Sequence, residues 1–150
     1  MLHPYIEQLL TNTILKTLKP ILYWGARILA AAIMAQTLYF KFTASDESVY
    51  IFTTVGIEPW SRIGIGVFEL IASILILIPA TVWLGSLLAV DLMAGAFGMH
   101  LTLLAIEIKG GGGQLFIYAL IVTFCGLYAF WQSRKEIPAA IKKYLPSVLQ

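Results

Sequence analysis

The sequence has few charged residues and almost no cysteine. Charged side chains make up 12% of its 150 residues, whereas an ordinary soluble domain carries about 25%. The single cysteine, Cys125, excludes an intrachain disulfide and the CxxC pairs of zinc and dithiol redox sites. The net charge is only +2, and the basic residues form no stripe with interleaved aromatics. We therefore expect no metal site and no nucleic-acid partner.

Apolar residues are correspondingly frequent. They account for 59% of the chain, and the mean hydropathy is +0.85. A helix needs about 20 residues to cross the core of a bilayer, so four spanning helices would use nearly the whole chain. The sequence therefore predicts one domain, residues 1–150, with an all-α fold. This fold is an integral membrane four-helix bundle whose main partner is the lipid bilayer.

Four apolar runs predict where the spans lie. Each run is long enough for a bilayer core, and polar or glycine-rich stretches separate most of them. The runs cover about residues 21–40, 63–79, 82–106 and 115–131. The second and third follow each other almost directly, which predicts a tight antiparallel hairpin. Gly110 to Gly113 predict a flexible turn before the last run.

Short surface helices are expected outside the spans. Residues 4–18 place most apolar and polar side chains on opposite faces, which is typical of an amphipathic helix at the membrane surface. Pro20 is expected to open the first span, because a proline is well tolerated in the first turn of a helix. Ser45, followed by two acids, predicts a helix over about 46–55. The basic tail around residues 134–145 suits a second surface segment.

The basic residues near the spans predict the orientation in the membrane. The side that carries more Lys and Arg is normally the cytoplasmic one. Six lie on the side of the termini and three in the opposite loops: Lys16, Lys19, Arg134, Lys135, Lys142 and Lys143 against Lys41, Arg62 and Lys109. We therefore expect both termini in the cytoplasm.

Ionisable residues interrupt the apolar runs at four places. A charge at mid-bilayer costs roughly 2.5 to 3.5 kcal/mol even on the lenient insertion scale, so we expect these side chains to find partners inside the bundle. Counted along the helices at about 1.5 Å per residue, Arg27 and Asp91 fall at similar depths near the cytoplasmic side. Glu69 and His100 do so near the outer side. The sequence therefore predicts a structural ion pair of Arg27 with Asp91 and an outer polar layer.

The outer layer is the better candidate for a ligand site. Arg62 precedes Glu69 by seven residues, about two helical turns, so both lie on nearly the same face. With Lys41 and Gln36, Arg62 is expected to guard the outer mouth of a polar pocket. A carboxylate beside the imidazole of His100 can relay protons or bind a polar head group. The same residues can instead serve only to fix helix register, and both interpretations stay open.

Four short segments have a characteristic order and spacing. They are LYFKF at residues 38–42, GIGVFEL at 64–70, LILIP at 75–79 and GAFGMHL at 95–101. In these segments the chain resembles the DoxX and DoxX-like family of small four-helix membrane proteins, over about residues 28–131. That family commonly has a lysine after an aromatic residue in the first span, a Gly-x-x-Glu-like core in the second and a histidine after small residues in the third. The resemblance implies Lys41, Glu69 and His100 as functional positions.

The resemblance also implies a class of function. Some family members look like membrane subunits of quinone-linked sulfur oxidation systems, others associate with redox or stress-response enzymes, and related animal proteins act as receptor assembly chaperones. It therefore implies an accessory or assembly subunit for membrane or redox proteins, located in a bacterial inner membrane. The alternative is a quinone-interacting subunit of an oxidoreductase complex.

One further observation limits these interpretations. The sequence contains no haem, iron–sulfur or flavin motif. Any enzymatic role is therefore that of a subunit of an oxidoreductase, and quinone is the one candidate for a bound cofactor. A small-solute or proton transporter is a third interpretation, and self-association into a homo-oligomer stays open.

Overall fold

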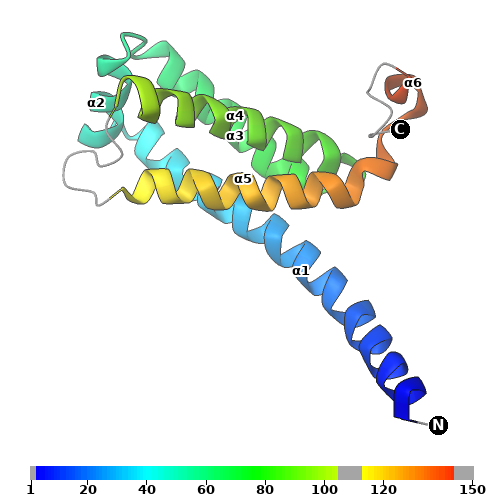
Figure 1. The fold of residues 1–150 in the computed structure, drawn as a ribbon. Coiled ribbons are helices and arrows are strands. Elements are labelled where there is room, and N and C mark those ends of the chain that lie inside the picture. The colour runs from blue at the N-terminus through cyan, green and yellow to red at the C-terminus, as the bar shows by residue number, and fades with distance from the viewer. Residues whose placement is uncertain (1–2, 105–112, 144–150) are drawn as a thin grey trace.

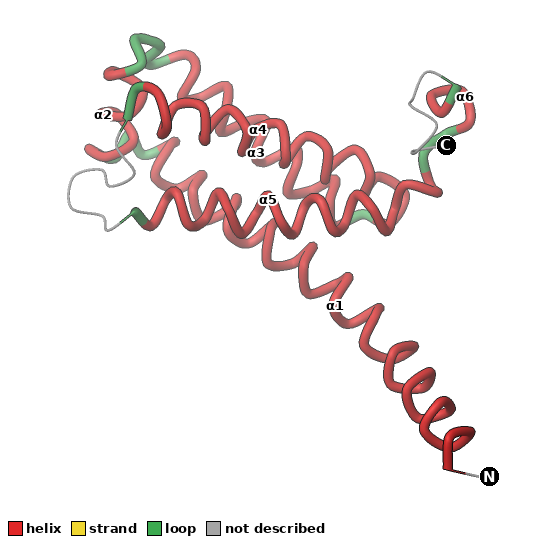
Figure 2. The backbone as a smooth tube through the Cα atoms, viewed as in Figure 1, coloured by secondary structure: helices red, strands yellow, loops and turns green. Residues whose placement is uncertain are grey.

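The protein is all-helical in a computed structural model, which describes residues 3–104 and 113–143. Within these ranges there is no strand (Figure 1, Figure 2). The long helices are α1 (His3–Phe42), α3 (Trp60–Leu77), α4 (Val82–Thr102) and α5 (Gln114–Ser133). The short elements are α2 (Asp46–Thr54), α6 (Ala139–Lys142) and the 3-10 turns η1 (Pro79–Thr81) and η2 (Arg134–Glu136). The predicted all-α class is confirmed.

Among the described residues, four stretches are long and apolar enough to cross a membrane. They are Thr13–Phe42, Trp60–Leu77, Pro79–Thr102 and Gln114–Glu136. α1 packs against α3 and α5, and α4 packs against the same two helices. Helices that follow each other in sequence are therefore antiparallel neighbours in a four-helix bundle (Figure 1). This confirms the predicted membrane bundle.

The two ends of the bundle are built differently. At one end lie α2, the C-terminal end of α1 and the beginning of α3 (Figure 1); we call it the α2 end. At the other end η1 joins α3 to α4, and α5 leads into η2 and α6; we call it the tail end. The N-terminal half of α1 projects from the bundle on the side of the tail end.

α1 is one continuous helix of 40 residues, about 60 Å long at 1.5 Å per residue. It runs through Pro20 without a break, whereas the sequence predicts a separate surface helix over residues 4–18 and a span that opens at Pro20. The physical reason lies in the surroundings of Pro20. A proline removes one backbone hydrogen bond of a helix, but residues 13–22 are exposed, so no tertiary contact draws the chain away from helical geometry there.

α2 forms where the sequence predicts it and ends one residue earlier. The hydroxyl of Ser45 accepts the backbone N–H of Ser48 at 3.3 Å, which caps the first turn. Gly56 follows the helix with a φ of +79°, a conformation that glycine adopts at little cost. The predicted glycine turn before α5 lies outside the described residues except for Gly113, which precedes α5 with a φ of +74°.

Small residues let the helices pack closely in the core. A side chain at Gly85 would clash with the backbone of Ile76, so this glycine permits the tight hairpin of α3 and α4. Gly126 on α5 faces Val90 of α4, whose methyl group would lie 3.0 Å from an added Cβ. Close approach at small residues is the usual packing device of membrane helices. The completely buried apolar residues are Ala30, Ala72, Ile76, Val82, Ala89, Val122 and Ala129.

Candidate functional site

Glu69 on α3 lies at the centre of a polar cluster inside the bundle. Its side chain is 5% exposed, and Oε2 lies 2.8 Å from Nζ of Lys41 on α1. The hydroxyl of Thr37 lies 3.0 Å from the same Oε2 and 2.8 Å from the backbone carbonyl of Met34, so its single proton is shared between two acceptors. The other carboxylate oxygen, Oε1, receives no hydrogen bond from the described part of the chain. The cluster is therefore a charge-neutral pair with one acceptor oxygen left over.

The local sequence explains how this cluster forms. Thr37 and Lys41 are four residues apart, so both lie on the face of α1 that meets α3. Gly66, one turn before Glu69, faces the end of α1, where an added Cβ would lie 3.2 Å from Cζ of Phe42. The absence of a side chain at Gly66 lets α1 approach α3 closely at this level.

Arg62 supports the cluster from the α2 end. Its Nε donates to both carboxylate oxygens of Glu58, at 2.8 and 3.0 Å, and Nη1 donates to the backbone carbonyl of Lys41. This carbonyl lies in the last turn of α1, where a helix leaves its carbonyls without partners. Arg62 therefore holds the end of α1 against the beginning of α3. The sequence predicts Arg62 at the mouth of a pocket. In the structure, its contact with Lys41 positions α1 against α3.

The cluster borders a central cavity of about 230 Å³. α1, α3, α4 and α5 all contribute to its walls, and α2 contributes Ile51 and Phe52 from the α2 end. Most of the lining is apolar and includes Ile33, Met34, Ile65, Leu92, Ala96 and Val122. An apolar cavity with a few convergent polar groups is the usual form of a small-molecule site.

A second, smaller cavity adjoins the first near α2. It has a volume of about 120 Å³ and shares Thr37 and Lys41 with the central cavity. Gln36, which the sequence places at the mouth of the pocket, lines this second cavity together with Glu47. Polar residues of α1 and α2 therefore continue the site toward the α2 end.

His100 reaches the same cavity from α4. It is 7% exposed, and its ring meets the ring of Phe116 edge to face, with the centroids 5.7 Å apart. Both His100 and Glu69 line this cavity. The hydrogen-bond partners of the Glu69 carboxylate, however, are Lys41 and Thr37.

The predicted ion pair of Arg27 with Asp91 does not form. Arg27 is 1% exposed, and its Nε and Nη2 donate to the carbonyls of Ile76 and Leu77 at 2.8 and 2.7 Å. Its guanidinium also lies over the ring of Trp24, 3.8 Å from the centroid. The physical reason is that α3 ends at Leu77 and leaves carbonyls that need donors. The depth of Arg27 in the membrane, on which the prediction rested, gives no sign of these backbone carbonyl partners.

Asp91 lies instead on the outer face of α4. It is exposed, as is Gly95 one turn further along, and both residues also line the central cavity. The cavity therefore reaches the lipid-facing surface of α4 at this level.

Thr37 is the member of the cluster that sequence reasoning missed. A threonine in an apolar run carries little information by itself, because its hydroxyl can bond to the backbone of its own helix. Its spacing of four residues from Lys41 is the signal that points to it.

Comparison with protein families identifies this arrangement. The model of the DoxX-like family matches residues 26–124. The chain belongs to the DoxX-like family. The match runs from the second half of α1 into α5 and includes Lys41, Glu69, Asp91 and His100. No curated protein and no solved structure matches the chain. This DoxX-like protein is therefore interpreted from its own geometry.

Proposed function

We propose that this DoxX-like protein binds a lipid-soluble molecule with a ring-shaped head group, of the quinone kind, as an accessory subunit of a membrane oxidoreductase. The observation that carries the proposal is the pair of the buried Glu69 with the half-buried Lys41 at the wall of a mostly apolar cavity. A pair that only fixed helix register would need no open space beside it.

The size of the cavity fits a single substituted ring. A cavity of about 150 Å³ is known to hold benzene, and the central cavity measures about 230 Å³. Exposed Asp91 and Gly95 line it as well, so a hydrocarbon tail has a way out toward the lipid. The apolar walls favour the ring of the ligand. The polar cluster favours the orientation in which the oxygen atoms of the ligand face Lys41 and Glu69.

The polar cluster suits both redox states of such a head group. The ammonium of Lys41 has three N–H donors, and one is engaged with Glu69, so a quinone carbonyl can accept another. A quinol hydroxyl can donate to Oε1 of Glu69, which has no donor from the described residues. Hydrogen bonds to charged groups contribute about 1.5 to 3 kcal/mol each. His100 faces the same space and offers a second group that can exchange protons.

An accessory role follows from the lack of redox-centre motifs in the sequence. Transfer of electrons to or from a quinone needs a second redox centre, which a partner protein would supply. The DoxX-like protein would then hold the head group and exclude water from it.

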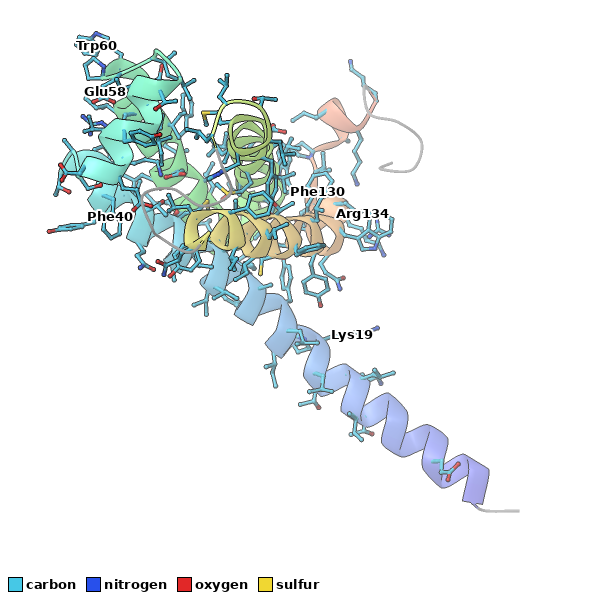
Figure 3. The ribbon with its side chains drawn as sticks, turned by 60° about the vertical axis from the view of Figure 1, so that its left-hand side comes forward. Lys19, Phe40, Glu58, Trp60, Phe130 and Arg134 are labelled. Carbon is cyan, nitrogen blue, oxygen red and sulfur yellow. The ribbon has the colours of Figure 1, made fainter. Side chains whose placement is uncertain are left out.

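The distribution of charge supports an orientation with both termini in the cytoplasm of a bacterial cell. Lys19 lies on the projecting part of α1 and Arg134 lies at the tail end, whereas Glu58 and Trp60 lie at the α2 end (Figure 3). Both described basic residues at the α2 end are paired with acids, Lys41 with Glu69 and Arg62 with Glu58. The positive charge is therefore concentrated at the tail end, which favours that end as the cytoplasmic one.

The direct test is a binding titration with the full chain in nanodiscs. A short-chain benzoquinone is compared with an alkylbenzene of the same chain length, which has the ring but no oxygen atoms. One hydrogen bond to a charged group is worth about a factor of ten, so we expect the quinone to bind at least about tenfold more tightly. Equal affinity of the two compounds would contradict the proposal.

A pair of matched variants assigns the affinity to the cluster. Glu69→Gln keeps the shape of the side chain and removes its charge, and we expect the preference for the quinone to fall. Glu136→Gln makes the same change on η2 at the tail end and should leave it unchanged. If both variants bind the quinone equally, the cluster is not the head-group site.

A further inference from the structure

Asp91 lies halfway along α4, and no residue in the described part of the chain neutralises it. It is nine residues after Val82 and eleven before Thr102, which at 1.5 Å per residue puts it about 13 Å and about 16 Å from the two ends. The side chain is exposed. It forms no hydrogen bond and no ion pair with residues 3–104 or 113–143.

A carboxylate in this position is unfavourable when lipid surrounds it. Even on the lenient insertion scale, a charge at mid-bilayer has a free-energy cost. Long Lys and Arg side chains lower this cost when they extend to the interface, but the aspartate side chain has a single methylene and cannot reach that far. A positively charged donor group at the same depth in the membrane would offset this cost.

Lys16, Lys19, Arg134 and Lys135 lie toward the tail end, and the Lys and Arg side chains further inside the spans are already engaged. Arg27 is buried and bonded to two carbonyls. Lys41 is engaged with Glu69, and Arg62 with Glu58. A symmetric contact through α4 would also place two Asp91 carboxylates near each other. Charge complementarity thus points to a different protein that carries a positive charge at mid-bilayer.

The surface around Asp91 has room for another helix. Ala94 and Gly98 follow at positions i+3 and i+7, so they lie on the same face of α4, and both are exposed. An added Cβ at Gly98 or at neighbouring Gly95 would meet no atom within 4 Å. Small residues let a second backbone approach closely, which strengthens polar contacts between membrane helices.

We propose that Asp91, Ala94 and Gly98 form a docking face for a transmembrane helix of another protein that carries Lys or Arg at mid-bilayer depth. The inference specifies the partner of the accessory role proposed above and rests on that role. The docked helix lies beside the part of the cavity that reaches the surface at Gly95. A ligand in the cavity is therefore next to the partner protein.

The test uses a synthetic probe in lipid nanodiscs with the full chain. The probe is a helical peptide of about 20 residues, built of Leu and Ala, with a single central Lys, and its control has Leu at that place. Binding is measured by energy transfer between labels on the peptide and on the protein. We expect the Lys peptide to bind roughly tenfold more tightly, since polar contacts between model membrane helices contribute about 1 to 2 kcal/mol.

Variants of the docking face make the result specific. Asp91→Asn should abolish the preference for the Lys peptide, and Asp91→Lys should transfer it to a peptide with a central Glu. Gly98→Leu should weaken binding of both peptides while leaving the bundle intact, because nothing lies within 4 Å of that position. Equal binding of Lys and Leu peptides to the unchanged chain overturns the inference.

Two other outcomes would also overturn it. One is that the unchanged chain shows no preference for the Lys peptide while Asp91→Asn alters self-association, because the face then belongs to a homo-oligomer. The other is that Asp91→Asn leaves the preference for the Lys peptide unchanged. The quinone titration is measured without any peptide, so a failure of this inference is distinguishable from a failure of the proposed ligand.

Discussion

Each end of the bundle holds a largely buried cation, Arg27 at the tail end and Lys41 at the α2 end, and the two cations have different roles. At the tail end, Arg27 donates to two backbone carbonyls and lies over an aromatic ring, and it is not among the residues that line the central cavity. At the α2 end, Lys41 is paired with Glu69 and faces that cavity. A buried charge in a membrane helix is thus a candidate site only when unfilled space and unused hydrogen-bonding capacity lie beside it.

The largest expected effect is on stability and concerns the structural role of Arg27. Arg27→Leu leaves the carbonyls of Ile76 and Leu77 without donors, and each unsatisfied buried group costs about 1 to 3 kcal/mol. We expect the free energy of unfolding to fall by about 3 kcal/mol, measured by denaturant titration in micelles with tryptophan fluorescence. The quinone affinity of the folded fraction should not change.

Arg134 supplies the matched control. It also lies over a tryptophan ring, with the guanidinium 4.0 Å from the centroid of Trp131, but its Nη1 bond to the Trp131 carbonyl is exposed. Arg134→Leu should therefore lower the free energy of unfolding by less than about 1 kcal/mol. Equal losses in the two variants would show that Arg27 has no special structural role.

The next effect separates binding from stability at the α2 end. A buried ion pair can often be replaced by apolar residues with no loss, or with a gain of about 1 to 4 kcal/mol. We expect the double variant Lys41→Met with Glu69→Leu to unfold at the same or higher denaturant concentration. It should nevertheless lose the roughly tenfold preference for quinone over alkylbenzene. A large loss of stability would instead assign the pair to the architecture of the bundle.

A smaller effect concerns the helix contact that places Lys41. Gly66→Ala puts a methyl group 3.2 Å from Phe42, and overpacking of this kind costs about 1 to 3 kcal/mol. We expect about 1 kcal/mol of lost stability and a weaker quinone affinity. Phe42→Leu in the same chain should restore both. Gly64→Ala is the control, because an added Cβ there meets nothing within 4 Å, and it should lower neither quantity.

The smallest effect is expected in the projecting part of α1. Pro20→Ala restores a backbone hydrogen bond in a stretch whose residues 13–22 are exposed. The helix should become locally more regular, while the free energy of unfolding of the bundle changes by no more than about 0.5 kcal/mol. Circular dichroism measures the first quantity and denaturant titration the second. A large change in bundle stability would mean that this part of α1 packs against the rest of the protein.

Sequence reasoning found the architecture because its signals are periodic and strong. Apolar runs located four spans, and the capping serine located α2, since these features depend on residues near each other in the chain. The Glu69 and His100 layer was predicted by counting depth along the helices, and both residues line the central cavity. The partner of Arg27 could not be predicted in this way, because backbone carbonyls at a helix end carry no side-chain signature. The role of Thr37 needed the packing of α1 on α3, which a glycine at position 66 permits.

The most direct test of the account is infrared difference spectroscopy of a quinone labelled with ¹³C at its carbonyl carbons. If Lys41 donates to the bound head group, the stretching frequency of one labelled carbonyl falls on binding. That downshift should disappear in the double variant Lys41→Met with Glu69→Leu and persist in Glu136→Gln. An unshifted carbonyl in the unchanged protein, or the same shift in the double variant, would contradict the assignment of the Lys41–Glu69 cluster as the head-group site.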